Sequence, residues 1–474
     1  MRWSGRQTRI CPLLHLLAVM TCLLVGTAQA LVESVGPNGI NAHIAHRQGL
    51  TGEGIGIAML SAGNARASHE AFAAGASERA VINHDFTGQG LRANSHDTQV
   101  AGIVVARGGP DCPACLGVAP GARLHSARIL DGGMSPLTLD RALHELIVNQ
   151  GCRIVVTGVQ IPGSAVTPDG SSIWSAIYDY YAEHYDVFFA NAAGNSETSV
   201  TVFGDAFNGI TTGGLALDGQ GRHRVVGSIS NPGPTPDGRR KPELTAPAHR
   251  LMIPNAAGDS AWSAAGSTRG ETSFAAPHTA GAAAVLMQRA AQTATPYDDK
   301  SLTIKAVLVN TADPNVLDKS SEPTDPNTVL WHPERGYGRL DVGRATALLD
   351  AGRVRPGRTL EQDSGWAYET LGFYEHHQYA VAARKNQRLV LTVTWHRRLL
   401  RRSAASYVEE APRFNLRLEV KSPDGQVLFS EYDPDNNLRK AALTLPQDGV
   451  YHIDIRNRVF QKDRDYALAF ELFS

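Results

Sequence analysis

Residues 273–290 constrain the fold of this chain more than any other segment, because they are apolar on nearly every side and rich in Ala and Gly. A helix that is apolar all round is stable in water only when other elements cover it. From about Gly54 to Leu349, apolar β-branched runs alternate with helical stretches. That alternation is typical of a doubly wound parallel sheet. We therefore expect an α/β fold with residues 273–290 as a buried central helix.

The pattern changes after residues 353–358, where Pro356 and Gly357 interrupt the helical periodicity. Before this linker, the sequence predicts strands at 55–60, 153–156 and 187–190 and a crossover helix at 137–150. After it, residues alternate with the period of a strand, and the predicted strands are 389–394, 416–420, 427–431, 450–456 and 466–472. This pattern indicates a second domain, a small antiparallel β-sandwich. A length of 474 residues suffices for two cores.

The first 30 residues have the pattern of a secretory signal peptide. Arginines at positions 2, 6 and 9 precede an apolar run at 13–25, which ends at Ala28-Gln29-Ala30, so we expect cleavage after Ala30. The run is shorter than the roughly 20 residues of a membrane span. No later segment is long and apolar enough either, so we expect no membrane span and a periplasmic or extracellular location. The net charge of −1 gives no electrostatic reason to expect a nucleic-acid partner.

Three cysteines remain in the mature chain: Cys112, Cys115 and Cys152. In an exported protein, the spacing Cys112-Pro113-Ala114-Cys115 favours a small loop disulfide over a redox centre. Three cysteines without a paired His motif do not supply a tetrahedral zinc site. No loop has acidic residues clustered at calcium-ligand spacing. We therefore expect no metal and no other cofactor.

Three fragments together resemble the motifs of one family. In chain order they are 95–102 (SHDTQVAG), 192–195 (AAGN) and 270–278 (GETSFAAPH). They are similar to the general-base, oxyanion and nucleophile motifs of the subtilisin-like serine proteases. Two further stretches, 116–120 (LGVAP) and 336–341 (GYGRLD), add to the resemblance.

The resemblance implies a subtilisin-like peptidase domain at 31–352, between the predicted signal peptide at 1–30 and the linker at 353–358. The β-sandwich domain at 359–474 resembles the jelly-roll modules appended to secreted proteases. A purely structural cap and a module that binds substrate or a surface remain open as its role.

Three residues receive roles from the resemblance. Ser273 is the nucleophile, His96 is the base that takes its proton, and Asn195 donates its side-chain amide to the oxyanion. The partner is then a peptide or protein substrate. The family's substrate-binding edge carries Ser-Leu-Gly, whereas this chain has Thr157-Gly158-Val159-Gln160. Gly158 still permits an extended peptide backbone to approach this edge and pair with it.

The fourth motif departs from the family at its catalytic acid. The run 54–63 (GIGIAMLSAG) resembles the first catalytic strand, which normally ends in Asp where this chain has Ser61. A triad carboxylate fixes the His tautomer and stabilises the imidazolium, which a hydroxyl does less well. In subtilisin, loss of the acid alone lowers kcat by about 3 × 10⁴. We expect Ser61 to face the His96 nitrogen that does not contact Ser273, and Ser61→Asp to raise hydrolysis.

Two acidic residues stand where the family has glycine. Asp97 follows His96, and Glu271 precedes Ser273 by two residues. Each either replaces the missing acid or is a solvated side chain at the rim of the site, and Glu271 alternatively shapes the specificity pocket. Adjacent residues on a helix face different directions, so we expect Asp97 to be poorly placed to replace the missing acid.

Two functions remain open. The first is an exported subtilisin-like endopeptidase with an atypical triad, and the second is a pseudoprotease that binds extended peptides in the same groove. Retention of Ser273, His96 and Asn195 favours catalysis. Ser61 favours binding, as does the short stretch 31–53, which leaves no room for an inhibitory propeptide of the usual length. The sequence does not indicate an oligomeric state.

Overall fold

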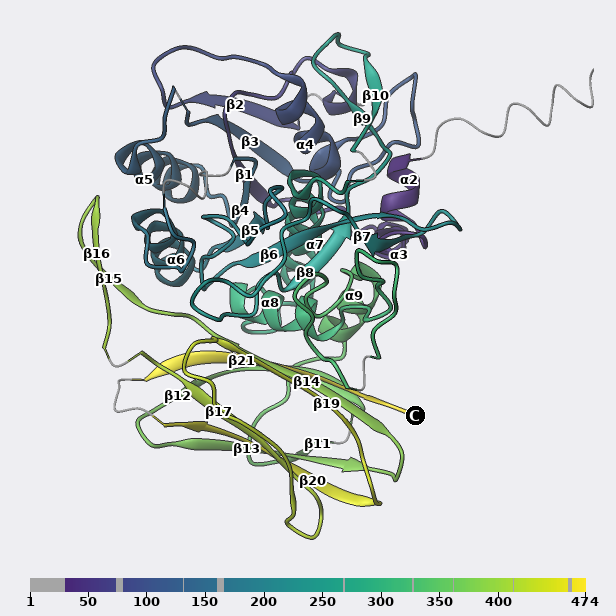
Figure 1. The fold of residues 1–474 in the computed structure, drawn as a ribbon, viewed down its shortest axis with the longest axis vertical. Coiled ribbons are helices and arrows are strands. Elements are labelled where there is room, and N and C mark those ends of the chain that lie inside the picture. Colours follow the sequence, from purple (N-terminus) through teal and green to yellow (C-terminus); the bar gives the residue numbers. More distant parts are fainter. Residues whose placement is uncertain are drawn as a thin grey trace, which may run out of the picture.

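A computed structural model of the chain describes residues 30–73, 80–130, 132–159, 166–266, 269–325, 328–360, 362–411, 413–458 and 463–474. The predicted signal peptide, apart from Ala30, lies outside the described residues. The remainder forms an α/β unit that packs against a unit built from β-strands (Figure 1).

One eight-stranded sheet runs through the α/β unit. Its order is β2-β3-β1-β4-β5-β6-β7, and β8 pairs with β6. Neighbouring strands are parallel except for β6 and β7. This is the predicted doubly wound α/β fold. The strands are β1 (Gly56–Ser61), β2 (Val81–Asp85), β3 (Arg123–Arg128), β4 (Ile154–Thr157), β5 (Phe188–Ala192), β6 (Ile210–Leu217), β7 (His223–Val226) and β8 (Leu244–Pro247).

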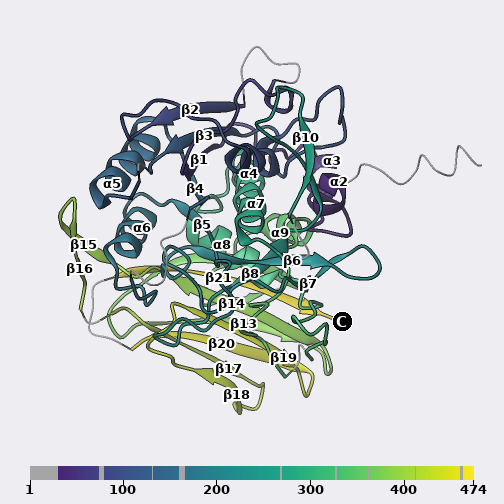
Figure 2. The same cartoon turned by 45° about the horizontal axis from the view of Figure 1, so that its top comes forward.

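Alternate residues of the central strands face two different cores. In β1, Ile57 and Met59 belong to one core, and Ala58 and Leu60 to the other. Helices α4 and α7 cover the first face of the sheet, and α5 and α6 cover the second (Figures 1 and 2). The helices of this unit are α2 (Ala30–Val35), α3 (Ala42–Arg47), α4 (Ser95–Val105), α5 (Pro136–His144), α6 (Ile173–His184), α7 (Thr272–Thr293), α8 (Ser301–Asn310) and α9 (Val342–Asp350).

Helix α7 is the buried central helix that the sequence predicts. Every residue from Phe274 to Gln288 is buried, whereas Ser273 in the first turn is partly exposed. Small side chains permit this position: a Cβ added at Gly281 would lie 2.5 Å from the Cβ of Val118. The helix packs against α4 and against β4, β5 and β6. Its first turn is thereby held close to the loop that follows β5, which contains Asn195.

The predicted crossover helix is present in two parts. Helix α5 ends at His144 and continues as a π-helical turn, η2 (Glu145–Asn149). A short hairpin of β9 (Leu251–Pro254) and β10 (Trp262–Ala265) lies beside α4. A 3₁₀ turn, η1 (Glu70–Phe72), precedes β2.

The β unit contains two facing sheets around one core. Their orders are β11-β13-β20-β17-β18 and β12-β21-β14-β19. All five predicted strands are present, as β14, β17, β18, β20 and β21. The strands are β11 (Thr359–Leu360), β12 (Ser364–Leu371), β13 (His376–Ala383), β14 (Arg388–Trp395), β15 (Leu399–Ser403), β16 (Ser406–Glu409), β17 (Leu416–Lys421), β18 (Val427–Glu431), β19 (Leu438–Thr444), β20 (Gly449–Asn457) and β21 (Arg464–Phe473). The likeness to a jelly roll stays a prediction, as do the domain boundaries.

The two units meet along helix α8, which packs against β14 and β21. At its end, the side chain of Asn310 accepts a hydrogen bond from Thr392 Oγ1 (3.0 Å) and donates one to Glu471 (3.1 Å). Lys440 Nζ donates to the carbonyl of Val309 (2.7 Å). Burial lowers the pKa of Lys440 to about 7. Polar groups of both units therefore satisfy one another in this interface.

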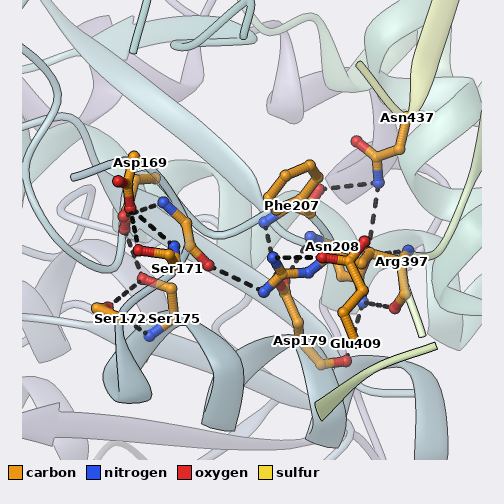
Figure 3. Close-up of polar contacts among 12 residues, drawn as sticks. Asp169, Ser171, Ser172, Ser175, Asp179, Phe207, Asn208, Arg397, Glu409 and Asn437 are labelled. Carbon is orange, nitrogen blue, oxygen red and sulfur yellow. Dashed lines mark hydrogen bonds and ion pairs between the residues drawn. The ribbon is translucent and has the colours of Figure 1, made fainter. Parts of the chain in front are cut away.

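A second contact between the units centres on Arg397, shown in Figure 3. Its guanidinium lies 2.8 Å from the carboxylate of Asp179 on α6, and both side chains are buried. Its backbone N–H donates to Asn208 Oδ1 (2.7 Å), and Asn208 Nδ2 donates to its carbonyl (2.8 Å). The guanidinium also stacks over the ring of Phe207. The hairpin β15–β16 continues from this contact along α6 (Figure 1).

A disulfide joins Cys112 and Cys115, as the sequence predicts, and Cys152 is buried as a free thiol. Burial raises the pKa of Cys152 to about 12, so this thiol is unreactive. Within the described ranges, no helix is both long and apolar enough to cross a bilayer. The same residues contain no group of three or more His, Cys, Asp or Glu side chains placed to hold a metal ion.

Candidate active site

Ser273 and His96 meet between the first turns of two helices. Ser273 is the second residue of α7, and His96 is the second residue of α4. His96 Nε2 lies 3.0 Å from Ser273 Oγ, which is a hydrogen-bonding distance. The His96 side chain is 42% exposed, so a substrate can reach the pair from solvent. The start of α7 also places the positive end of the helix dipole beside Ser273.

Thr272, to which the sequence motifs assign no role, holds the side chain of Asn195 in place. Asn195 Oδ1 accepts hydrogen bonds from the backbone N–H of Thr272 (2.8 Å) and from its hydroxyl (2.9 Å). The hydroxyl in turn accepts from the N–H of Gly194 (3.0 Å). Because two donors hold the oxygen of the amide, its nitrogen faces away from Thr272 with two N–H groups to donate.

Gly194 must be glycine for this loop to form. Its φ is +110°, a region that other residues rarely adopt. A Cβ at this position would lie 2.4 Å from the side-chain nitrogen of Asn231. The Ala-Gly-Asn run thus has a steric basis, and it sets Asn195 next to the first turn of α7.

The second ring nitrogen of His96 contacts Asp97. Nδ1 lies 3.2 Å from Asp97 Oδ1, and the carboxylate is only 2% exposed. Its other oxygen, Oδ2, accepts from the N–H of Gly63 (2.8 Å) and from Asn94 Nδ2 (2.6 Å). Asn94 is the N-cap of α4, and its Oδ1 accepts from the N–H of Asp97 (2.8 Å). Asp97 is therefore held on both sides by neighbouring donors.

This contact corrects the expectation that Asp97 is poorly placed. The expectation used the angular spacing of side chains along a regular helix. His96 and Asp97 lie in the first turn, where side chains tilt toward the helix N-terminus and no preceding turn restricts them. Gly63 and Asn94 provide the donors there. An Asn three residues before an acid, ahead of an apolar helix, is a capping pattern and was the available signal for Asn94.

Ser61 does not make the contact that the sequence predicts for it. It ends β1 and is fully buried, and its Oγ has no hydrogen-bond partner among the described residues. Nδ1 of His96 is instead next to Asp97. Ser61 still borders the site, because a Cβ added at Gly158 would lie 3.6 Å from Ser61 Oγ and 3.9 Å from His96 Cε1. Gln160, at the end of the expected substrate edge, lies outside the described residues.

Glu271, the other acidic residue of interest, directly precedes α7 as its N-cap residue but makes no side-chain cap hydrogen bond. The pKa of His249 is lowered, mainly by burial and also by the charge of Arg250. The charge of Glu271 partly opposes this shift.

The arrangement has the parts that acyl transfer requires. A hydroxyl at a helix N-terminus contacts an imidazole nitrogen, and an amide of fixed orientation lies next to the same helix turn. Such a set can generate a nucleophile and stabilise the negative charge that develops on a carbonyl oxygen.

Solved structures share part of this fold. The PatG macrocyclase in complex with peptide is 20% identical, with 66% of this chain and 97% of that chain covered and a TM-score of 0.50. The prenylagaramide maturation protease PagA is 21% identical, with 65% and 98% covered and a TM-score of 0.49. The MycP3 protease from the type VII (ESX-3) secretion system is 20% identical, with 68% and 90% covered and a TM-score of 0.48. At these identities the likeness concerns the fold alone.

The sequence match identifies the family. The model of the subtilase family matches residues 35–338, which is more than half of the chain and includes Ser61, His96, Asn195 and Ser273. The match ends before the β unit begins. The chain belongs to the subtilase family of serine proteases.

Proposed function

We propose that this chain is an exported serine endopeptidase in which Ser273 is the nucleophile, His96 the base and Asn195 an oxyanion donor. The observation that carries the proposal is the 3.0 Å contact between Ser273 Oγ and His96 Nε2. The orientation of Asn195 supports it as well, because Thr272 holds the side-chain oxygen of Asn195 and leaves the amide nitrogen to donate.

The reaction proceeds in two halves. Ser273 Oγ attacks the carbonyl carbon of the scissile peptide bond while its proton passes to His96 Nε2. Asn195 Nδ2–H donates to the resulting oxyanion. His96 then gives the proton to the leaving amine, and the C–N bond breaks to leave an acyl-enzyme. A water molecule, deprotonated by the same nitrogen, releases the new carboxylate and restores Ser273.

An extended peptide is the substrate class that suits the surroundings of this pair. Gly158 follows β4, at the carboxyl end of the parallel sheet, and lies beside Ser61 and His96. The absence of a side chain at Gly158 permits a peptide backbone to approach this edge and pair with it.

Export is part of the proposal. It rests on the N-terminal pattern of residues 1–30 and is supported by the Cys112–Cys115 disulfide, since such bonds persist in oxidising compartments. N-terminal sequencing of protein recovered from the medium or periplasm tests it, with Leu31 expected as the first residue.

The test of catalysis is cleavage of a library of fluorescence-quenched peptides by the mature protein. We expect turnover that is lost in Ser273→Ala and in His96→Ala and retained in Ser95→Ala, an exposed neighbour of His96. Peptides that bind without being cleaved, in a protein that unfolds cooperatively, would replace this proposal with the pseudoprotease.

A further inference from the structure

We infer that Asp97 is the positioning residue for His96 and has taken over the role that the family assigns to the acid at position 61. The inference rests on the proposed function, since it concerns the same base and the same nucleophile. It identifies the carboxylate that substitutes for the one missing at Ser61.

The first argument concerns the tautomer of His96. To accept the proton of Ser273, Nε2 must carry no hydrogen, so a neutral ring must have its proton on Nδ1. Nδ1 lies 3.2 Å from Asp97 Oδ1. A carboxylate there accepts the Nδ1 proton and then stabilises the imidazolium that forms when Ser273 attacks. Asp97 is thus placed to perform both functions of a triad acid.

The second argument concerns how firmly the carboxylate is held. Oδ2 accepts from Gly63 N–H and from Asn94 Nδ2, which leaves Oδ1 directed at His96. Gly63 belongs to the turn directly after Ser61. In the family, this turn follows the usual acid. In this chain the same turn binds the carboxylate of Asp97 from α4, so a negative charge lies beside the strand end that lacks the acid.

A helix cap alone does not account for this geometry. Capping of α4 uses the side chain of Asn94 and the backbone N–H of Asp97. Asp97 Oδ1 takes no part in that cap. A buried carboxylate oxygen needs a donor of its own, and His96 Nδ1 is at hydrogen-bonding distance.

Asp97→Asn separates a positioning role from a structural one. The amide oxygen can keep the bonds to Gly63 and Asn94, so the cap and the fold are retained. The amide nitrogen then faces Nδ1 as a donor, which moves the ring proton to Nε2 and blocks the base. We expect kcat on a peptide ester to fall by about 10³–10⁴, with KM changed by less than about threefold.

Two variants at position 61 are the matched controls. Ser61→Ala removes a hydroxyl that has no hydrogen-bond partner among the described residues, and it is expected to lower kcat far less than Asp97→Asn does. Ser61→Asp is expected not to raise kcat, because Nδ1 already has its carboxylate. This reverses the expectation from the sequence alone. The inference is overturned if Ser61→Ala loses as much activity as Asp97→Asn, if Ser61→Asp gains orders of magnitude, or if Asp97→Asn stays within about threefold of the parent.

A double variant tests whether Asp97 acts through His96, and an NMR spectrum reports the state of the ring without turnover. In a His96→Ala background, Asp97→Asn should not lower the residual hydrolysis rate further, because the effect of Asp97 depends on the His96 ring. In ¹⁵N NMR of the His96 imidazole, the parent should carry its proton on Nδ1 and Asp97→Asn on Nε2. A parent with the proton on Nε2 overturns the inference. An Nδ1 proton in a parent without Ser273-dependent turnover supports the Asp97 contact and overturns the proposed function instead.

Discussion

At the scale of a single residue, Thr272 links helix α7 to Asn195. Its backbone N–H is one of the groups that the start of a helix leaves without an intrahelical acceptor. Asn195 Oδ1 provides that acceptor, and the Thr272 hydroxyl binds the same oxygen and Gly194. The bond that caps α7 therefore also orients the side-chain amide of Asn195, the proposed oxyanion donor.

Asn195→Ala should lower kcat on a peptide ester by about 10²–10³ with little change in KM, because the lost hydrogen bond forms only in the transition state. Thr272→Val removes one of two donors to Asn195 Oδ1 and should cause a smaller fall. Steady-state kinetics check both. A larger loss in Thr272→Val than in Asn195→Ala would show that Thr272 acts by another route than through Asn195.

Regular elements show how far the sequence predicts this molecule. The strands β1, β4 and β5 and helix α7 were predictable, because buried parallel strands and an all-round apolar helix leave strong patterns. The hairpin β15–β16 was not, since it contains Arg401, Arg402 and several exposed positions and is held by contact with α6. Its pairing depends on tertiary contacts that local patterns do not record.

The candidate site shows the same limit at the start of α4. The motif residues His96 and Ser273 were predictable because the family pattern contains them. Asp97 was a candidate, but its placement beside His96 was not predictable, because it depends on Gly63 and Asn94, which approach Asp97 from a different loop and from the helix cap. The family motif assigns the acid to the end of β1, where this chain has the hydroxyl of Ser61, which contacts no hydrogen-bond partner in the part of the chain that the structure describes.

Arg397 allows a test of the contact between the two units. It lies just after β14 and contacts α6. Its side chain is 5% exposed and pairs with the fully buried Asp179, so Arg397→Met leaves that carboxylate without its cation. We expect a loss of about 3–5 kcal/mol in the free energy of unfolding. Arg289→Met is the control, because Arg289 and Asp350 are 34% and 32% exposed in their pair, so the loss of this pair should cost at most about 1 kcal/mol.

Denaturant titrations of both variants give this comparison. Equal losses for the two would contradict the assignment of Arg397 as the buried link between the units.

For the whole molecule, several buried histidines predict sensitivity to acid. Burial lowers the pKa of His125 and of His223 to about 4 and that of His278 to about 3. In the unfolded chain a histidine titrates near about 6.5. Between these values the unfolded state binds protons that the folded state does not, so stability falls as pH drops below about 6.5.

The variant His223→Gln tests how much of this dependence of stability on pH comes from His223. Each such histidine contributes about 1.4 kcal/mol per pH unit between its two pKa values. His223 Nε2 contacts the carbonyl of His249 at 3.0 Å, a bond that a Gln amide can keep. Stability measured by denaturant titration from pH 4 to 6.5 should therefore depend less steeply on pH in the variant, by about that amount. An unchanged slope would mean that His223 is protonated in the folded state.

Covalent capture of Ser273 tests the central claim most directly. A fluorophosphonate requires an activated hydroxyl and needs no knowledge of the peptide substrate. Intact mass and peptide mapping of the mature protein should show one adduct, located on Ser273, and its rate of formation should fall by orders of magnitude in His96→Ala. No adduct on a folded protein, or labelling of Ser273 that is independent of His96, would contradict the account.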